Sequence, residues 1–479
     1  MTQELAFLSV AEASRMLMAR KISPVDLVEA FLARIDAVDG RIRSYILIDA
    51  ENARAKARTA EAEIMAGKWR GPLHGIPYAV KDNYFTKGLR TCANSRVLLD
   101  HVPDFDAAAI ERLTNAGAIL LGKLNTWEFG TGLGDFADDA AYPHALNPWK
   151  DGYFTGGSST GSGAAVAAGT AMFALGSDTG GSIRAPAALC GVQGMKPTYG
   201  RISRYGLLPN CWSLDVAGPL TWTIEDSAIV MNALAGKDER DSGTADEPVP
   251  DYTRGLDGGV RGLRIAVIRD AQHPEPADPA VAAGIDDVVS VLAGEGALIF
   301  EVELPLPPAR YREVTTLISG TERATVHEKD FVEHADLMGR ELRQSIMTGF
   351  AHRAIDYVAA QRRRRELAQS MNAFVKEYDA VITPCLNHTA ASMSDAAAVK
   401  RCQMAGATTA FNISGHPALS LRTGFDADGL PTSAQIAGRY FDESSVLRVA
   451  QAYERARDWH TRRPMTEAAT AAKKETVDA

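Results

Sequence analysis

The sequence predicts an α/β fold, in which helices pack on a central β-sheet. Between residues 71 and 236, short apolar runs are separated by glycine and proline, and the runs at 76–80 and 118–121 have the length of buried strands. Helical patterns lie around and within this region, including an apolar stretch at 164–174 that predicts a buried helix. Alternating strand and helix signals are typical of the α/β class. Apolar residues make up 46% of the chain, enough to build a large core.

The first 70 residues are expected to be mostly helical. Ser23 followed by Pro24 predicts a helix start, because serine caps a helix and proline suits its first position. Apolar residues within 25–35 then recur at helical spacing. A strand-like segment at 45–48 precedes an alanine-rich helix that ends near residue 66.

The second half of the chain is expected to return to the same sheet. An acidic connection at 237–252, rich in Pro, Gly and Asp, is predicted to lie on the surface. Residues 310–378 are predicted to form charged amphipathic helices that cap one edge of the sheet. Strands are predicted at 264–268, 298–304, 380–384 and 418–423, and a helix at 279–293.

No long flexible linker interrupts the chain, so we expect one domain, residues 1–479. Its predicted parts are N-terminal helices (1–70), a core (71–236), the surface connection (237–252), the rest of the sheet with its helical cap (253–465) and a frayed polar tail (466–479).

Charge and composition exclude several classes of partner. The net charge is −9, whereas binding to a nucleic-acid backbone requires clustered Lys and Arg. The one basic run, 362–365, is followed by Glu366 and is expected to be a solvated or salt-bridged helix face. No window approaches the about 18 consecutive apolar residues of a membrane span, and residues 1–10 lack the basic start of a secretory signal. We therefore expect neither a nucleic-acid partner nor a membrane partner.

The cysteines point to a reducing compartment. There are five, scattered and without CxxC spacing, so we expect no disulfide framework and no zinc site. The expectation is a cytoplasmic protein that needs no metal and no cofactor.

Two glycine–serine clusters and one lysine carry the strongest chemical signal. The clusters are Gly156–Ser162 and Asp178–Arg184. A serine on such a turn can attack a carbonyl while neighbouring N–H groups hold the oxygen that becomes negative. Lys81 follows an apolar stretch, 75–80, and a lysine kept from water at a strand end would have a lowered pKa and could act as a base. Together these residues suggest a hydrolase that uses neither histidine nor metal.

The residues alone leave alternatives open. The first cluster could be a flexible linker or a phosphate cradle, and Lys81 could be an ordinary surface lysine. The cluster also matches G-x-S-x-G, which would make Ser159 the nucleophile of an α/β-hydrolase, with His388 or His416 downstream. The weak strand signal at 151–155 counts against that nucleophile elbow.

Three motifs resemble those of the amidase signature family. They are Gly75–Asp82, Gly156–Ser162 and Gly176–Pro186, and the likeness continues through 191–206 and 411–438, so it spans nearly the whole chain. Order and spacing of three separate motifs make a chance match improbable. The resemblance implies a single-domain amidase signature fold, with a central, mixed, twisted β-sheet covered by helices on both faces.

The resemblance also implies a Ser–cisSer–Lys triad. Ser182 corresponds to the family's nucleophile, Lys81 to its base, and Ser158 to a bridging serine that follows a cis peptide bond. The oxyanion hole corresponds to the backbone N–H groups of Thr179 to Ser182, that is Thr179, Gly180, Gly181 and Ser182. Gly132 lies where relatives use backbone near the scissile group.

Several other residues are given structural roles or mark departures from the family. Asp178 and Arg184 are expected to form a buried pair that fixes the second loop, and Lys196 and His416 are predicted to be structural. The segments 149–155 and 207–213 differ from the family pattern, the second from the small-residue run of the A subunit of glutamyl-tRNA amidotransferase. Trp127 and Trp212 are expected to narrow or line an apolar pocket.

The function implied is hydrolysis of an acyl C–N bond through a serine acyl-enzyme. The expected substrate is a small, apolar or aryl amide, or a carbamate (a urethanase reaction) or hydrazide, and a homodimer is common among relatives. The alternative is the glutaminase A subunit of a glutamyl-tRNA(Gln)/aspartyl-tRNA(Asn) amidotransferase. A third possibility is a scaffold that has lost its chemistry, although all three triad positions are filled.

Overall fold

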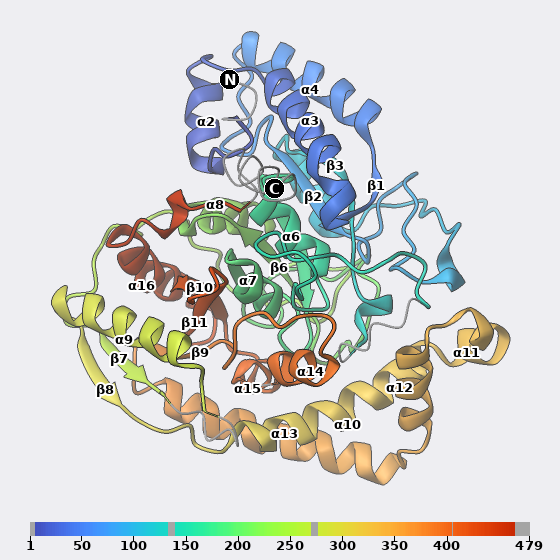
Figure 1. Ribbon diagram of the computed structural model, residues 1–479, viewed down its shortest axis with the longest axis vertical. Helices are drawn as coiled ribbons and strands as arrows, with labels where there is room; N and C mark the ends of the chain where they lie inside the picture. Colours follow the sequence, from blue (N-terminus) through green and yellow to red (C-terminus); the bar gives the residue numbers. More distant parts are fainter. Residues whose placement is uncertain (1–4, 133–138, 270–275, 405, 465–479) are drawn as a thin grey trace, which may run out of the picture.

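A large mixed sheet organises the protein (Figure 1). The computed structural model describes residues 5–132, 139–269, 276–404 and 406–464. The strand order is β1-β3-β2-β4-β6-β5-β10-β11-β9-β7-β8. The strands are β1 (Tyr45–Ile48), β2 (Pro77–Lys81), β3 (Ile119–Leu124), β4 (Phe173–Asp178), β5 (Gln193–Lys196), β6 (Val216–Thr221), β7 (Arg264–Val267), β8 (Leu298–Glu301), β9 (Ala380–Pro384), β10 (Ala418–Phe425) and β11 (Pro431–Ala437).

The direction of β2 and β4 brings Lys81 close to the second glycine–serine cluster, Asp178–Arg184. β2 lies between β3 and β4 and runs parallel to both, with Val80 opposite Leu175. The carboxyl ends of β2 and β4 therefore meet at the same edge of the sheet, which is where ligands bind in open α/β sheets. The pairs from β4 through β6, β5, β10 and β11 to β9 are antiparallel. The sheet is thus mixed, as expected.

Helices cover both faces of the sheet. α6 and α7 pack on each other and on the central strands, while α8, α9 and α16 form a second group of packed helices. The principal helices outside the cap are α2 (Val10–Met18), α3 (Pro24–Ile42), α4 (Ala50–Met65), α5 (Ala108–Asn115), α6 (Thr160–Ala168), α7 (Arg184–Cys190), α8 (Ile224–Leu234), α9 (Pro279–Gly294), α14 (Ala396–Met404), α15 (Thr408–Ser414) and α16 (Glu443–Arg455).

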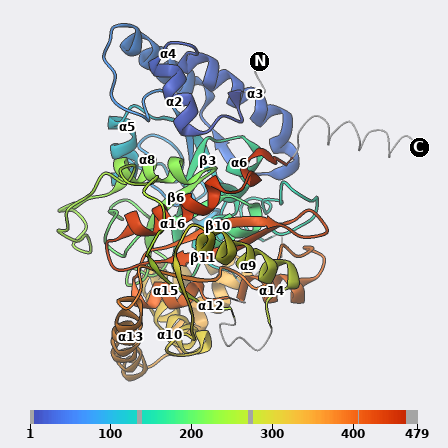
Figure 2. The same cartoon turned by 90° about the vertical axis from the view of Figure 1, so that its left-hand side faces the viewer.

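A helical cap lies at the end of the molecule opposite α3 and α4 (Figures 1 and 2). It consists of α10 (Pro308–Val326), α11 (Glu328–His334), α12 (Arg340–Phe350) and α13 (Ala354–Val375). α10 is its centre, because it packs on α12, on α13 and on α15. The helices predicted over 310–378 are present.

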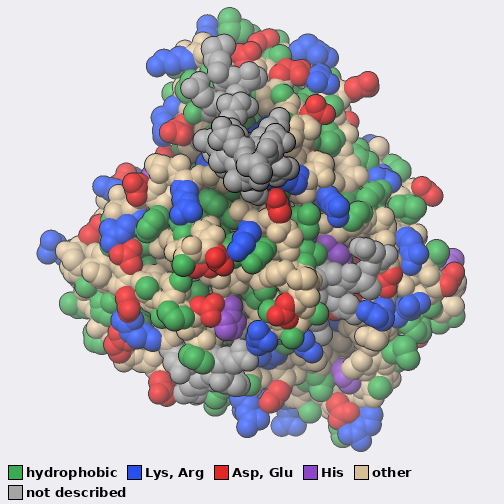
Figure 3. All heavy atoms as spheres, in the orientation of Figure 1, with side chains coloured by type: hydrophobic (Ala, Val, Ile, Leu, Met, Phe, Trp, Pro, Cys, Tyr) green, Lys and Arg blue, Asp and Glu red, His purple; other side chains and the backbone are tan. Residues whose placement is uncertain are grey.

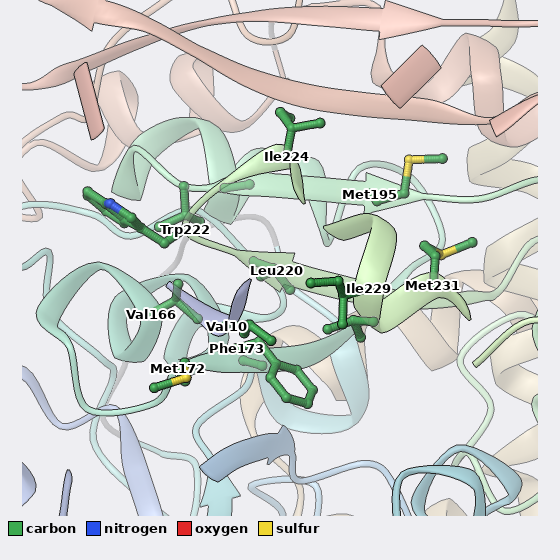
Figure 4. Close-up of a cluster of buried hydrophobic side chains, with 14 of the residues drawn as sticks. Val10, Val166, Met172, Phe173, Met195, Leu220, Trp222, Ile224, Ile229 and Met231 are labelled. Atoms are coloured by element: carbon green, nitrogen blue, oxygen red, sulfur yellow. The ribbon is translucent and has the colours of Figure 1, made fainter. Parts of the chain in front are cut away.

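The core between the sheet and its helices is densely apolar (Figure 4). Phe173 of β4 is fully buried and stacks on Tyr78 of β2, with ring centroids 5.1 Å apart and planes 7° from parallel. Side chains from α2, α6, β4, β5, β6 and α8 meet in this cluster, among them Val10, Val166, Met172, Phe173, Met195, Leu220, Trp222, Ile224, Ile229 and Met231.

Some element boundaries differ from the prediction. The helix expected at 164–174 ends at Ala168, and β4 starts at Phe173. Gly169 adopts a left-handed conformation (φ 71°) and ends the helix, so one apolar run is divided between two elements. The strand expected at 298–304 ends at Glu301. The tail at 466–479 lies outside the described residues.

The surface carries both signs of charge. Lys and Arg are interspersed with Asp and Glu on the face shown in Figure 3. Arg363, from the basic run, pairs with Glu366 at 2.7 Å on α13, so at this pair the run is an ion-paired helix face, as expected. All five cysteines are buried free thiols. Across the described parts of the chain, none of the helices has the length and apolar character to cross a membrane.

Candidate active site

Lys81 lies at the carboxyl end of β2 with its side chain fully buried. Its Nζ is 2.7 Å from the hydroxyl oxygen of Ser158 and 3.0 Å from that of Ser177 at the end of β4. Asn83 donates to the same Ser177 oxygen from Nδ2, at 3.0 Å. The structure therefore brings Lys81 and Ser158 together, and it adds Ser177 as a second hydroxyl on the amine.

Burial sets the charge state of Lys81. Desolvation lowers the pKa of Lys81 to about 7, although the negative charges of Asp215 and Asp178 act in the opposite direction. A substantial fraction of the amine is consequently neutral near neutral pH, which is the form that can accept a proton.

The first serine loop precedes α6. The peptide bond between Gly157 and Ser158 is cis. Gly157 has no room for a side chain, since a Cβ there would lie 2.2 Å from Cζ2 of Trp127. Ser158 is 2% exposed, and its carbonyl accepts from the N–H of Trp127 at 3.1 Å. These contacts fix the Ser158 hydroxyl beside Lys81.

The nucleophile-elbow alternative finds no support in this geometry. Ser159 is fully buried, and its hydroxyl oxygen accepts from the N–H of Ser177 at 3.3 Å. His388 lies 2.9 Å from a carboxylate oxygen of Asp278. His416 is 2.9 Å from the Ser414 hydroxyl and stacks on Tyr440, and burial lowers the pKa of His416 to about 3.

The second loop is held by a buried ion pair. Burial alone would raise the pKa of Asp178, but the Arg184 guanidinium holds it well below its ordinary value. Nη2 of Arg184 is 3.0 Å from Oδ1 of Asp178, and both side chains are fully buried. Asn412 also donates to the Asp178 carboxylate, at 2.8 Å. The expected pair that fixes the loop is present.

The backbone of this loop faces a cavity. Gly181 has φ +128°, and its N–H donates to Asp178 at 2.7 Å. The Gly180 carbonyl accepts from the Thr408 hydroxyl at 2.9 Å, and a Cβ at Gly180 would have one neighbour within 4 Å, at 3.7 Å. The Thr179 hydroxyl donates to Asp215 at 2.5 Å.

Ser182 is half-buried and lines a cavity of about 430 Å³, the Ser182 cavity. Gly132, Thr179 and Gly180 line it as well, so four predicted site residues share one space. The remaining wall is mixed, with the apolar Trp127 and Met404 and many hydroxyl, amide and charged side chains: Thr131, Asn210, Arg312, Thr315, Thr316, Ser319, Arg323, Glu341, Gln344, Ser345, Thr348, Gln403, Thr408 and Thr409.

One expectation about the cavity needs correction. Trp212 does not line it: the side chain is 43% exposed, and the residue's carbonyl accepts from Tyr199 at 2.9 Å. The wall of the cavity combines the apolar Trp127 and Met404 with polar side chains. The cap helices α10 and α12, which the sequence predicted only as a cover, supply much of it.

The two serine loops touch each other directly. The N–H of Ser159 donates to the Ser182 carbonyl at 3.3 Å. Ser158 and Ser182 therefore lie on backbone segments that contact each other. Lys81 lies on the buried side of these segments, beside Ser158. Within the described residues, no cluster of three or more His, Cys, Asp or Glu side chains is placed to hold a metal ion.

A buried amine beside hydroxyls lies at the edge of a mixed α/β sheet, an arrangement suited to a hydrolase that uses an activated serine. Residues 26–447 match the family model described as Amidase. The chain therefore belongs to the amidase family, whose enzymes act on C–N amide bonds.

Curated proteins and solved structures agree with this assignment. The chain is 40% identical over 490 residues to the A subunit of glutamyl-tRNA(Gln) amidotransferase from Chloroflexus aggregans, covering 96% of this chain and 99% of the relative. It is similar to peptide amidase from Stenotrophomonas maltophilia, with a TM-score of 0.83, 30% identity and coverage of 96% and 98%. It is also similar to a chain of a vestigial complex described in relation to an s-triazine catabolic enzyme, with a TM-score of 0.87, 31% identity and coverage of 94% and 98%.

Proposed function

We propose that the chain hydrolyses an acyl C–N bond through an acyl-enzyme on Ser182, with Lys81 and Ser158 as its proton relay. The observation that carries this proposal is the 2.7 Å contact between Nζ of Lys81 and the hydroxyl oxygen of Ser158 in a site closed to solvent. This pair of side chains lies next to the cavity that Ser182 lines, so it is placed to relay a proton from the Ser182 hydroxyl.

The reaction proceeds in balanced proton transfers. Ser182 passes its hydroxyl proton to Ser158, and Ser158 passes its own to the neutral amine of Lys81. The Ser182 oxygen bonds to the amide carbon, the proton returns along the relay to the nitrogen, and the C–N bond breaks. Water then attacks the ester, gives a proton to the relay, and releases the acid as Ser182 recovers its proton.

Backbone N–H groups stabilise the oxygen that becomes negative. Asp178 engages the N–H of Gly181, so we assign the oxyanion hole chiefly to the N–H groups of Thr179, Gly180 and Ser182, with Gly181 beside them. Gly132 contributes backbone to the same cavity. The Ser158 hydroxyl accepts from Nζ of Lys81, and we expect its contact with the Ser182 hydroxyl to form when substrate binds.

Mutation of the triad tests the proposal. Ser182→Ala is expected to reduce amide hydrolysis by at least about 10⁴-fold. Lys81→Ala is expected to reduce it by about 10²–10⁴-fold, because the relay loses its proton acceptor. Circular dichroism should show an unchanged fold in both. Near-normal hydrolysis by either variant would contradict the assignment.

For the substrate, the curated relatives favour the glutaminase A subunit of a tRNA amidotransferase. The support is 40% identity over 96% of this chain and 99% of the relative. In this role the chain would release ammonia from glutamine only together with partner subunits.

One observation favours a free-standing amidase instead. The segment 207–213, which departs from the A-subunit pattern, places Asn210 in the cavity wall. A residue from this departing segment would therefore contact the substrate. The substrate in this case is a small amide, carbamate or hydrazide, and the buried free thiols support a cytoplasmic location.

Assay of the purified chain separates the two candidates. A free-standing enzyme would turn over simple primary amides, anilides, carbamates or hydrazides by itself. The amidotransferase component would be nearly idle with glutamine until its partners are added. Rapid turnover of simple amides with no response to those partners would reject the amidotransferase role.

A further inference from the structure

The cap helices turn polar faces toward the Ser182 cavity. Side chains three or four residues apart on a helix lie on one face, and such sets from two cap helices line the cavity. The α10 set is Arg312, Thr315, Thr316, Ser319 and Arg323, and the α12 set is Glu341, Gln344, Ser345 and Thr348. A substrate in the cavity would therefore contact polar side chains of the cap helices as well as the loop that carries Ser182.

Arg323 on α10 is held in a fixed position by neutral partners. Its Nε donates to Oδ1 of Asn210 at 2.8 Å, and its Nη1 donates to the Ser345 hydroxyl. In the described part of the chain, its Nη2 has no hydrogen-bond acceptor. The guanidinium is thus oriented by two contacts and keeps one nitrogen for a ligand.

The negative charge of Asp215 acts on Arg323 and opposes the effect of burial on its pKa, without an ion pair between the two side chains. Among the described residues, no carboxylate lies within 4.0 Å of its guanidinium nitrogens. Burial lowers the pKa of Arg323, which shows that desolvation already opposes its charge. Arg323 is half-buried in the cavity wall and has no ion-pair partner among the described residues, so an anion that enters the cavity would offset part of the cost of desolvating its charge.

Arg323 is connected to the reacting groups through one side chain. Nδ2 of Asn210 donates to the Gly130 carbonyl at 3.1 Å and lies 3.5 Å from the Thr179 hydroxyl. Gly130 is close to the relay, because a Cβ built on it would lie 3.4 Å from the Ser158 hydroxyl. A group bound at Arg323 would consequently sit near the amide under attack.

We propose that Arg323 binds a carboxylate of the substrate, so that the enzyme prefers amides with a free carboxylate to their neutral counterparts. The inference rests on the proposed amide hydrolysis at Ser182. Arg312, the other cavity arginine, lies eleven residues earlier, about 16 Å away along α10, so a small substrate cannot use both. Glu341 lies elsewhere on the wall, next to Trp127 and Gly132.

Binding to a variant that cannot turn over tests the proposal without depending on catalysis. Calorimetry on Ser182→Ala would compare succinamate with succinamide, and N-acetylglycine with N-acetylglycinamide. The first pair places the carboxylate on the acyl side, and the second places it on the leaving-group side. Charge-assisted hydrogen bonds predict that the charged member of at least one pair binds about tenfold tighter or more.

Added substitutions assign the preference to Arg323. Arg323→Gln should bring the charged-to-neutral affinity ratio close to one, while Arg323→Lys should keep most of it. Arg343→Gln on α12 is the matched control, because Arg343 donates to the Ala335 carbonyl and does not line the cavity, and it should leave the ratio unchanged.

The outcomes separate this inference from the proposed function. A ratio near one for both pairs in the Ser182→Ala parent, or a ratio that Arg323→Gln leaves intact, would overturn the carboxylate site. If Arg323→Gln does not fold, the charged-to-neutral affinity ratio of the Ser182→Ala parent alone tests the carboxylate site. Normal hydrolysis by Ser182→Ala would overturn the proposed function and leave the binding result standing.

Discussion

The pH dependence of hydrolysis follows from the buried position of Lys81. The relay needs the neutral amine, and the pKa of Lys81 is lowered from 10.5 to about 7 by burial. At pH 7 the neutral fraction therefore rises from about 1 in 3,000 to about one half, which corresponds to about 5 kcal/mol between the two protonation states. We expect kcat/KM to increase with pH and to level off above pH 8.

The low-pH limb gives the magnitude that an assay can check. With one titrating amine, kcat/KM should be about tenfold below its plateau at pH 6 and about 100-fold below it at pH 5. Initial rates with an uncharged amide, measured from pH 5 to pH 9, supply the profile. An uncharged substrate keeps its own ionisation out of the result.

Two variants test whether the break in the pH profile, where kcat/KM begins to level off, comes from Lys81. The pKa of Lys196 is also lowered to about 7 by burial, but its Nζ donates to the Pro197 carbonyl, away from the cavity. Lys196→Met should therefore keep the break. Asp215→Asn should move it to lower pH, because the Asp215 charge raises the pKa of Lys81. A flat profile between pH 5 and pH 8, or a break lost in Lys196→Met, would refute the reasoning.

Three further substitutions test the loop and the core. Gly181→Ala should abolish hydrolysis and leave the fold intact, since φ is +128° and the new Cβ would lie 2.7 Å from the Thr408 hydroxyl; an active variant would show that the loop tolerates the change. Arg184→Leu should lower the free energy of unfolding by about 3–5 kcal/mol, because Asp178 stays buried without its partner, and urea unfolding with no shift would count against this. Phe173→Ala should cost about 3–5 kcal/mol by the same measurement, and a loss below about 1 kcal/mol would mean that the site repacks.

The candidate triad could be predicted because its chemistry depends on local motifs. Ser158 and Ser182 sit in glycine-rich turns, and Lys81 ends an apolar strand, so each is visible in a short window of sequence. Ser177 was missed although it lies inside the motif at 176–186. Its role depends on the parallel pairing of β2 and β4, which places its hydroxyl 3.0 Å from Lys81.

The cavity wall could not be predicted for a physical reason. A helix that turns a polar face toward a ligand cavity has the same amphipathic pattern as one that turns it toward solvent. Arg323 on α10 and Gln344 on α12 therefore resemble surface residues. Asn210 and Trp212 show the same limit in a loop, because only the fold decides which of the two enters the cavity.

The predicted boundaries of helices and strands were wrong where the amino-acid composition does not change across the boundary. The apolar stretch 164–174 gives no signal for the switch from α6 to β4 except Gly169. By contrast, Ser23 and Pro24 marked the start of α3 correctly, since the Ser23 hydroxyl accepts from the N–H of Asp26.

Covalent labelling tests the central claim most directly. The purified chain is treated with a fluorophosphonate, digested, and mapped by mass spectrometry. The proton relay predicts one adduct, on Ser182, which is absent from Ser182→Ala and forms more slowly in Lys81→Ala. An adduct on Ser159, or no adduct in a chain that hydrolyses amides, would contradict the account.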